Sequence, residues 1–554
     1  MKRLLFVLLV TIPLLAQQKK FSVVEATIPE MQAALREKRV TSRELVLQSL
    51  VRIATYEDRL NAIITVNPKA LEEADALDRE RAAGRIRGPL HGIPVALKDN
   101  IHTTDMPTTG GALAFAELIP PYEATITKKL RDGGAIILAK TQLTELANWV
   151  AGDPSMPNNY NALTGFGFNP YDPRRDPREA TADGRPALNT GGSSSGAGTA
   201  VSFWAANVGT ETSGSILSPA NATMLAAIKP TVGRVSRHGV IPITADQDTP
   251  GPMARTVTDA AILLGVIEGA DPNDEATTRC TPVRDYTPFL KRDGLKGARI
   301  GIPRAFYYDK VTPPGEKNTR GGLNPDQAKT MDEAIAVLKA EGAVVVDPAD
   351  IPSVVDPDRS RNYLLWGICT DMNGVKAKEC SIDFAYGMER DFNKWLASLG
   401  DRAPVKSLTE LRRWNTAHQK MGAIRYGQSL LDISNAMDLD LFRARYEADR
   451  ARDVELAGTH GIDEAMKTHK LDAILFPGPG GASISARPGY PTVLVPFATI
   501  PNAPTTAFPE EFKANRAPFG VSFAGGACSE PALIRIAYAF EQATKRRVPP
   551  PAFP

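Results

Sequence analysis

The 554-residue sequence has little net charge, few histidines and few cysteines, and these shortages argue against several classes of function. Its 65 basic and 63 acidic residues leave a net charge of +2, and no basic run is long enough to predict nucleic-acid binding. The six histidines show no metal-ligand spacing, and the sequence contains neither a P-loop nor a dinucleotide fingerprint. We therefore expect no metal, no cofactor and no nucleic-acid partner.

The four cysteines also lack a Cys-x-x-Cys pair, which argues against a zinc site. They are Cys280, Cys369, Cys380 and Cys528. Cys369 and Cys380 are the closest pair in the sequence, and an oxidising compartment would permit a disulfide between them. Buried free thiols are the alternative, and the sequence leaves both open.

Residues 1–16 have the pattern of a secretory signal peptide. Lys2 and Arg3 precede an apolar run over 4–15, and Ala16 would precede the cleavage site. The run is too short to span a bilayer comfortably. We expect export, to a periplasm or out of the cell, without stable membrane insertion after cleavage. An uncleaved membrane tether is the alternative.

Apolar patterns of helical and strand type alternate along the chain. Thr41 and Glu44 form a capping-box pattern before an amphipathic helix over 45–60, and the apolar run 93–97 predicts a buried strand. Further helices are predicted over 71–83, 124–131, 257–268 and 531–545, and further strands over 135–139, 298–303, 343–346 and 471–476. This alternation predicts an α/β layered fold with a largely buried sheet.

No internal repeat or clear linker divides the sequence, which favours one large domain over 17–554. Two irregular excursions interrupt the pattern, at 153–189 and 503–518, and the first is dense in Asn, Pro, Arg and Asp. Long loops in compact domains are commonly functional or disordered.

Lys98 is the first candidate for chemistry because it directly follows the predicted buried strand. Open α/β sheets bind ligands at the carboxyl ends of their strands. An unperturbed lysine has a pKa near 10.4, so Lys98 would have to be desolvated before it could act as a base near neutral pH. A salt bridge with Asp99 or another neighbour is the alternative.

Two Gly/Ser-rich turns, over 191–198 and 210–216, are the other candidates. Their hydroxyls and unhindered backbone N–H groups suit acyl transfer, which needs a nucleophile, a proton relay and donors for an oxyanion. Ordinary turns, a linker or a phosphate-binding turn are the alternatives. Ser194 also lies at the centre of a Gly-x-Ser-x-Gly match, but a nucleophile elbow needs a preceding strand, and residues 183–190 do not predict one.

Together and in order, these segments resemble the amidase signature family of Ser-cisSer-Lys amidohydrolases. The similarity covers nearly all of the chain after residue 16 and implies that family's fold, a mixed β-sheet core flanked by helices in one large domain. The matching stretches are 88–100, 191–198, 209–216, 229–233, 248–255 and 518–525.

The resemblance implies a role for each candidate residue. Ser215 would be the nucleophile, Ser193, on a cis peptide bond, would relay its proton, and Lys98 would be the final base. The oxyanion hole would consist of the backbone N–H groups of Thr212, Ser213, Gly214 and Ser215. Water would then hydrolyse the acyl-enzyme after release of ammonia or an amine.

Within this family the chain looks most similar to exported bacterial peptide amidases, which remove the C-terminal amide of peptides, and the stretches 143–149, 407–411 and 538–544 carry this closer resemblance. An aryl or acyl amidase, an ester-tolerant amidase, the amidase subunit of a transamidosome and a non-catalytic binding protein with the same fold are the alternatives.

Three departures from the family pattern bear on these expectations. Ser213 replaces an Asp or Gly, the segment between Ser193 and Ser215 is about two residues short, and the excursion 153–189 is long. A shortened segment would misplace the serine relay, and a misplacement of ~1 Å can cost ~100-fold in rate.

Overall fold

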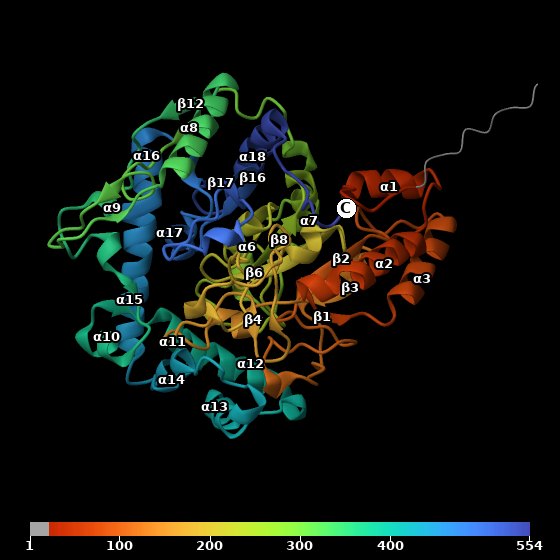
Figure 1. Ribbon diagram of the computed structural model, residues 1–554, viewed down its shortest axis with the longest axis horizontal. Coiled ribbons are helices and arrows are strands. Elements are labelled where there is room, and N and C mark those ends of the chain that lie inside the picture. The colour runs from red at the N-terminus through yellow and green to blue at the C-terminus, as the bar shows by residue number, and fades with distance from the viewer. Residues whose placement is uncertain (1–20) are drawn as a thin grey trace, which may run out of the picture.

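The computed structural model describes residues 21–554 and is built around one 11-stranded mixed sheet (Figure 1). Its strand order is β1-β3-β2-β6-β8-β7-β16-β17-β15-β9-β12. The strands of this sheet are β1 (Ile63–Val66), β2 (Pro94–Lys98), β3 (Ile136–Thr141), β6 (Ala206–Glu211), β7 (Ala226–Lys229), β8 (Thr249–Ala254), β9 (Arg299–Gly301), β12 (Val344–Val346), β15 (Ala473–Pro477), β16 (Thr492–Ile500) and β17 (Ala517–Ala524). The α/β fold with a mixed sheet is therefore confirmed.

Helices lie on both sides of this sheet, and small two-stranded ribbons occupy the connections. The helices are α1 (Ile28–Arg36), α2 (Ser42–Leu60), α3 (Ala70–Ala82), α4 (Thr125–Asp132), α5 (Ala197–Ala200), α6 (Leu217–Ala222), α7 (Val257–Ile267), α8 (Pro325–Ala340), α9 (Pro352–Val355), α10 (Met372–Ala377), α11 (Asp383–Gly387), α12 (Asn393–Ser398), α13 (Leu408–Ala417), α14 (Ser429–Asn435), α15 (Arg443–Val454), α16 (Glu464–His469), α17 (Ala482–Ala486) and α18 (Glu530–Thr544). The ribbons are β4 (Tyr160–Asn161) with β5 (Gly165–Phe166), β10 (Lys310–Val311) with β11 (Arg320–Gly321), and β13 (Gly367–Ile368) with β14 (Cys380–Ser381).

Local signals in the sequence account for several of these elements. Thr41 and Glu44 form the predicted capping box at the start of α2, which begins three residues earlier than the predicted helix. The strand predicted over 93–97 is present as β2, one residue later than predicted, and its five residues are all buried. Because β2 lies between β3 and β6 and is parallel to both, its last residue, Lys98, lies inside the sheet.

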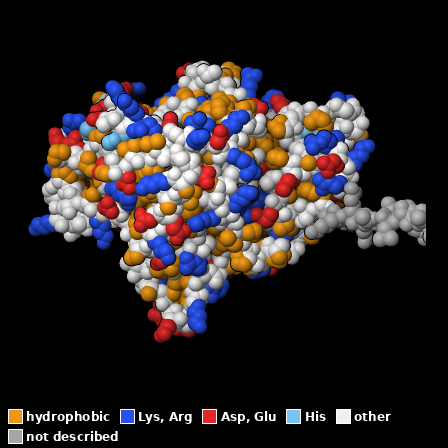
Figure 2. Space-filling model, turned by 90° about the horizontal axis from the view of Figure 1, so that it is seen from above, with side chains coloured by type: hydrophobic (Ala, Val, Ile, Leu, Met, Phe, Trp, Pro, Cys, Tyr) orange, Lys and Arg blue, Asp and Glu red, His pale blue; other side chains and the backbone are white. Residues whose placement is uncertain are grey.

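Figure 1 shows α1, α2 and α3 at one end of the molecule, beside β1 and β3, and the group α10–α14 at its lower edge. Buried apolar residues within 21–554 form several separate clusters. The largest lies along the sheet, a second fills the space among α11, α12, α13 and α14, and a third packs α2 and α3 against β3. Within residues 21–554, none of the helices has the length and apolar character needed to cross a membrane. On the face in Figure 2, acidic and basic side chains are interspersed.

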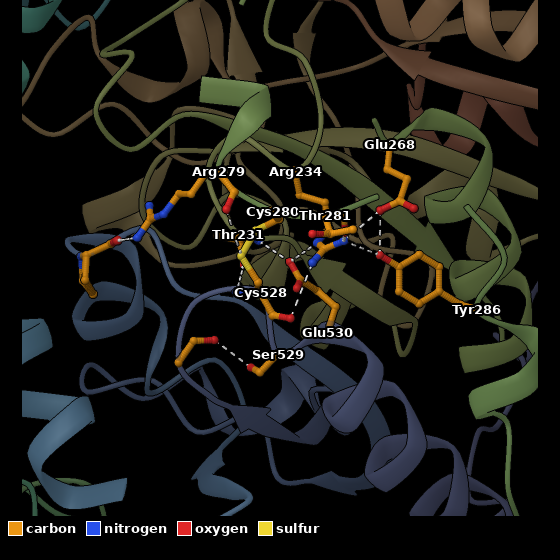
Figure 3. Close-up of a disulfide and its surroundings, with 12 residues drawn as sticks. Thr231, Arg234, Glu268, Arg279, Cys280, Thr281, Tyr286, Cys528, Ser529 and Glu530 are labelled. Atoms are coloured by element: carbon orange, nitrogen blue, oxygen red, sulfur yellow. Dashed lines mark hydrogen bonds and ion pairs between the residues drawn. A yellow bond between two sulfur atoms is a disulfide. The ribbon is translucent and has the colours of Figure 1, made fainter. Parts of the chain in front are cut away.

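All four cysteines are in disulfides. Cys369 and Cys380 are bonded to each other, as one of the two alternatives predicted. The second disulfide, Cys280–Cys528, was not predicted, because its cysteines are 248 residues apart in the sequence. It fastens the loop that precedes α18 to the segment after α7 (Figure 3).

The Cys280–Cys528 disulfide lies beside a buried ionic network that joins the same segments (Figure 3). Arg234 lies between Glu268, at 2.9 Å, and Glu530, at 2.8 Å. Tyr286 donates a hydrogen bond of 2.7 Å to Glu268. Two carboxylates paired to one guanidinium, with a phenol as additional donor, satisfy charges that would be costly to bury unpaired.

Candidate active site

Lys98 lies at the carboxyl end of β2 with its side chain fully buried. Its Nζ donates a hydrogen bond of 2.7 Å to Ser193 Oγ. Nζ also lies 2.9 Å from Thr210 Oγ1 and 3.3 Å from the Thr210 carbonyl oxygen, on the neighbouring strand β6. Asn100 donates to the same Thr210 hydroxyl at 3.1 Å. The parallel pairing of β2 with β6 therefore positions the amine against Ser193.

Burial lowers the pKa of Lys98 to about 7, from an ordinary value of 10.5. The carboxylates of Asp248 and Glu211 act in the opposite direction, but neither touches the amine. The alternative, a salt bridge from Lys98 to Asp99, is not observed. Asp99 is paired instead with Lys140, on β3, at 3.0 Å. Lys98 is consequently a buried amine that is about half protonated near neutral pH.

Ser193 and Ser215 lie on two turns that are joined through their backbones. The N–H of Ser194 donates to the carbonyl oxygen of Ser215 at 3.1 Å. A Cβ at Gly192 would lie 2.9 Å from Ser215 Cα, so this close approach requires glycine. The structure thus places Lys98, Ser193 and the backbone of Ser215 in one region, as the resemblance implies.

Ser194 stabilises the turn rather than serving as a nucleophile. Its hydroxyl donates to the carbonyl oxygen of Thr210 at 3.1 Å and accepts from the Thr210 N–H at 3.2 Å. The side chain is fully buried, and no strand of the described residues runs directly into its turn. Both observations argue against a nucleophile elbow at Ser194.

The turn that carries Ser215 follows β6 and leads into α6. Gly214 has a φ of +93°, a left-handed conformation that favours glycine. The buried carboxylate of Glu211 accepts from the N–H groups of Ile216, at 2.7 Å, and Leu217, at 2.9 Å. Glu211 therefore fixes the start of α6 and the turn before it.

Exposure along this turn matches a site open to substrate. Ser215 is half-buried, and Ser213 is exposed, with its hydroxyl 3.3 Å from that of Ser483. Ser215 Oγ makes no hydrogen bond to a protein group of residues 21–554. A hydrogen bond connects the side chains of Lys98 and Ser193. The turns of Ser193 and Ser215 are connected by the backbone hydrogen bond from Ser194 to Ser215.

The segment between the two serines differs from the family pattern in two respects. Its helix, α5, has only four residues, consistent with a segment shorter than the family's. The resemblance also implied a cis peptide bond before Ser193, and this is not what the structure has. The cis bonds of the described residues precede Pro154 and Pro348. Gly191, with a φ of +95°, redirects the chain ahead of Ser193 instead.

Asp248 is a site residue to which the sequence assigned no role. It lies in the stretch 248–255 that carried the resemblance, and it is 9% exposed. Its carboxylate accepts from the hydroxyl of Thr212 and from the N–H groups of Ile243, at 2.9 Å, and Thr244, at 3.1 Å. Burial raises its pKa to about 7. Asp248 thus holds Thr212, in the turn that carries Ser215, from the side.

Comparison with known proteins agrees with this architecture. Residues 44–534 match the model of the Amidase family. A probable amidase from Arabidopsis thaliana is 34% identical over 539 residues, which are 96% of this chain and 92% of the relative. A glutamyl-tRNA(Gln) amidotransferase subunit from Thermosynechococcus vestitus is 32% identical over 94% of this chain and 98% of its own length.

Solved structures give the same result. A native peptide amidase from Stenotrophomonas maltophilia superposes with a TM-score of 0.77 at 35% identity, covering 95% of this chain and 98% of that one. An amidase family protein from Bacillus anthracis superposes with a TM-score of 0.79 at 30% identity, covering 95% of this chain and 92% of that one. The chain therefore belongs to the amidase signature family. It is an amidase-family hydrolase, an enzyme that acts on amide bonds.

Proposed function

We propose that the protein hydrolyses carboxylic amides through an acyl-enzyme on Ser215, with Ser193 as proton relay and Lys98 as base. The observation that carries this proposal is the buried amine of Lys98, 2.7 Å from Ser193 Oγ, with its pKa lowered to about 7. Near neutral pH about half of such an amine is in the neutral form that accepts a proton, and a pKa near the working pH is the optimum for general-base catalysis.

In the first half of the reaction, neutral Lys98 takes the proton of Ser193 Oγ while Ser193 takes that of Ser215 Oγ. Ser215 Oγ bonds to the carbonyl carbon of the amide, and the carbonyl oxygen becomes an oxyanion. The N–H groups of Thr212, Ser213, Gly214 and Ser215 are the donors proposed for it. The C–N bond then breaks as the proton returns through Ser193 to the leaving nitrogen, which departs as ammonia or an amine.

In the second half, water replaces the amine. Lys98, neutral again, takes a proton from water through Ser193 as the water oxygen attacks the ester carbonyl. The tetrahedral intermediate collapses, the carboxylic acid leaves, and the proton returns to Ser215 Oγ. This sequence requires the two serine hydroxyls to come within hydrogen-bond distance, and the backbone bond between their turns keeps them close.

The proposed substrates are peptides with a C-terminal primary amide. The similarity to peptide amidase structures over 95% of the chain supports this choice, and aryl and short acyl amides are the competing class. Ammonia release, measured across peptide amides, aryl acylamides and simple amides, would separate the two classes. Release from none of them, by protein that still labels at Ser215, would exclude both.

A fluorophosphonate probe tests the nucleophile directly. We expect covalent labelling of the native protein at Ser215, and none of Ser215→Ala. Ser213→Ala is the matched control, because Ser213 is exposed on the same turn and would contribute only its backbone N–H. Labelling of Ser215→Ala at another serine would overturn the assignment.

We also propose that the protein is exported. The pattern of residues 1–16, which lie outside the described residues, supports this, and the two disulfides fit an oxidising compartment. N-terminal sequencing of the mature protein should begin near Gln17. A mature chain that begins at Met1 would contradict cleavage of a signal peptide.

A further inference from the structure

A cavity lies next to the turn that carries Ser215, and its lining includes none of Lys98, Ser193 and Ser215. Its volume is about 410 Å³. A smaller void, lined by Thr210 and Thr212, shares Arg237, Val240 and Asp248 with this cavity. Asp248 therefore borders the cavity while its carboxylate holds the hydroxyl of Thr212.

The charges around the cavity cancel except at two positions. Arg237 is forked onto Asp274, with Nε 2.8 Å from Oδ2, and Asp391 is paired with Arg390 at 2.8 Å. Asp248 is the lining carboxylate that has no ion pair with a described side chain. Lys394, at the exposed end, is the cation of the lining that has no ion pair within residues 21–554.

Keeping the Asp248 carboxylate ionised and buried without a cation costs free energy. Its oxygens receive hydrogen bonds from one hydroxyl and two N–H groups, but a buried carboxylate without a cation still carries a desolvation penalty. A positive group that reached Asp248 through the cavity would remove part of that penalty. The electrostatics of the cavity thus favour a cation at this end.

Three aromatic residues, Tyr122, His238 and Trp395, also line the cavity. Tyr122 stacks on His238 with ring centroids 4.8 Å apart and an angle of 18° between the rings. The indole N–H of Trp395 is already used, because it donates to His102 Nε2 at 2.8 Å. Aromatic faces attract both apolar groups and cations. The lining of the cavity therefore combines a carboxylate residue without an ion pair in the described chain and three aromatic residues.

We propose that this cavity binds a small organic cation, an ammonium group joined to an aromatic or apolar part, with the charge at Asp248 and the apolar part against Tyr122, His238 and Trp395. The proposal goes beyond amide hydrolysis, because it concerns a ligand that does not react. It also couples the cavity to the nucleophile turn, since Asp248 touches Thr212.

Calorimetric titration of Ser215→Ala with benzylammonium, at about pH 8 where Asp248 is ionised, tests the proposal. We expect one molecule bound per chain, and binding of the neutral benzyl alcohol weaker by about tenfold or more. Asp248→Asn should weaken benzylammonium binding by about tenfold, and Ser398→Trp, an exposed change on the cavity wall, should block it.

Lys394→Ala is the matched control, because it removes a charge of the opposite sign from the same cavity. The Lys394→Ala variant should bind benzylammonium as tightly as, or more tightly than, the protein that keeps Lys394. Equal binding of benzyl alcohol, binding unaffected by both Asp248→Asn and Ser398→Trp, or no binding up to about 10 mM would overturn the proposal. None of these results depends on whether Ser215 is the nucleophile, so the two proposals can fail separately.

The native enzyme offers a second readout, which rests on the proposed function. Asp248 and Glu211 are the charged groups that raise the pKa of Lys98, and Asp248 itself is influenced by Arg237 and Asp391. A cation at Asp248 would offset its field and lower the pKa of Lys98 further. The rise of fluorophosphonate labelling with pH should therefore move to lower pH when benzylammonium is bound, but not with benzyl alcohol.

Discussion

At the scale of single residues, the site depends on a buried amine that is not paired with a carboxylate. Protonated Lys98 cannot accept a proton from Ser193, so acylation should rise with pH, with an apparent pKa of about 7, and level off above it. Stopped-flow labelling of Ser215 across pH would measure this. In Lys98→Arg, the guanidinium stays protonated, so the rate of labelling should fall by at least about 1,000-fold at every pH. A flat profile between about pH 6 and 9 would exclude Lys98 as the base.

The same amine should also cost stability. The pKa of Lys98 is about 7 in the folded protein, against an ordinary 10.5, so between these values the unfolded chain binds more protons. The free energy of unfolding contributed by this group is therefore lower near pH 6 than near pH 10. At about 1.4 kcal/mol for each tenfold change in proton affinity, the difference is at most about 5 kcal/mol.

Lys98→Met should consequently be more stable than the native protein near pH 6, and the advantage should shrink as the pH rises. Urea unfolding at both ends of this pH range would measure the change. A constant difference between the two proteins would contradict the pKa assigned to Lys98.

At the scale of elements, the sequence predicted the helices and strands whose signals come from neighbouring residues. It missed the side-chain contacts that depend on pairing between distant strands. The Thr41–Glu44 capping box and the apolar run that forms β2 were both readable, because their signals are local. The contacts of Lys98 with Thr210 were not, since Thr210 lies 112 residues away and reaches the amine only through the β2–β6 pairing. The pairing of Asp99 with Lys140 was missed for the same reason.

The two irregular excursions illustrate the same limit, because they contact each other. Arg178 reaches from 153–189 to donate to the carbonyl oxygen of Thr506 at 2.7 Å, and its guanidinium lies over the Phe508 ring at 4.8 Å. Arg174 lies over the Phe512 ring at 4.2 Å. Composition predicted two irregular segments but could not predict that they pack together.

Replacing both Arg174 and Arg178 with Ala should release the 503–518 segment. We expect limited proteolysis within it to accelerate by about tenfold, because local opening exposes a loop to cleavage. Labelling of Ser215 by a small probe should change by less than about threefold. Arg185→Ala is the control, since the guanidinium of Arg185 is paired with Asp183 on its own loop. Equal cleavage in both variants would show that the arginine contacts do not hold the segment.

At the scale of the whole molecule, one sheet collects strands from residues 63 to 524, so distant parts of the chain share one core. The Cys280–Cys528 disulfide closes a loop of 248 residues within it, whereas Cys369–Cys380 closes one of 11. The sequence favoured the short pair only because it was short. A disulfide that closes a longer loop restricts the unfolded chain more. Chain entropy therefore predicts that Cys280–Cys528 stabilises the protein more than Cys369–Cys380 does.

Replacing the cysteines pairwise with serine should therefore destabilise the protein unequally. Loop entropy predicts a loss of about 5 kcal/mol for Cys280→Ser with Cys528→Ser, against about 3 kcal/mol for Cys369→Ser with Cys380→Ser. The first change also loosens the start of α18, where Glu530 must stay paired with the buried Arg234, so it has a second route to destabilisation. Thermal midpoints of the two variants and the oxidised parent would rank them. A larger loss from the Cys369–Cys380 pair would mean that local packing around these disulfides outweighs chain entropy.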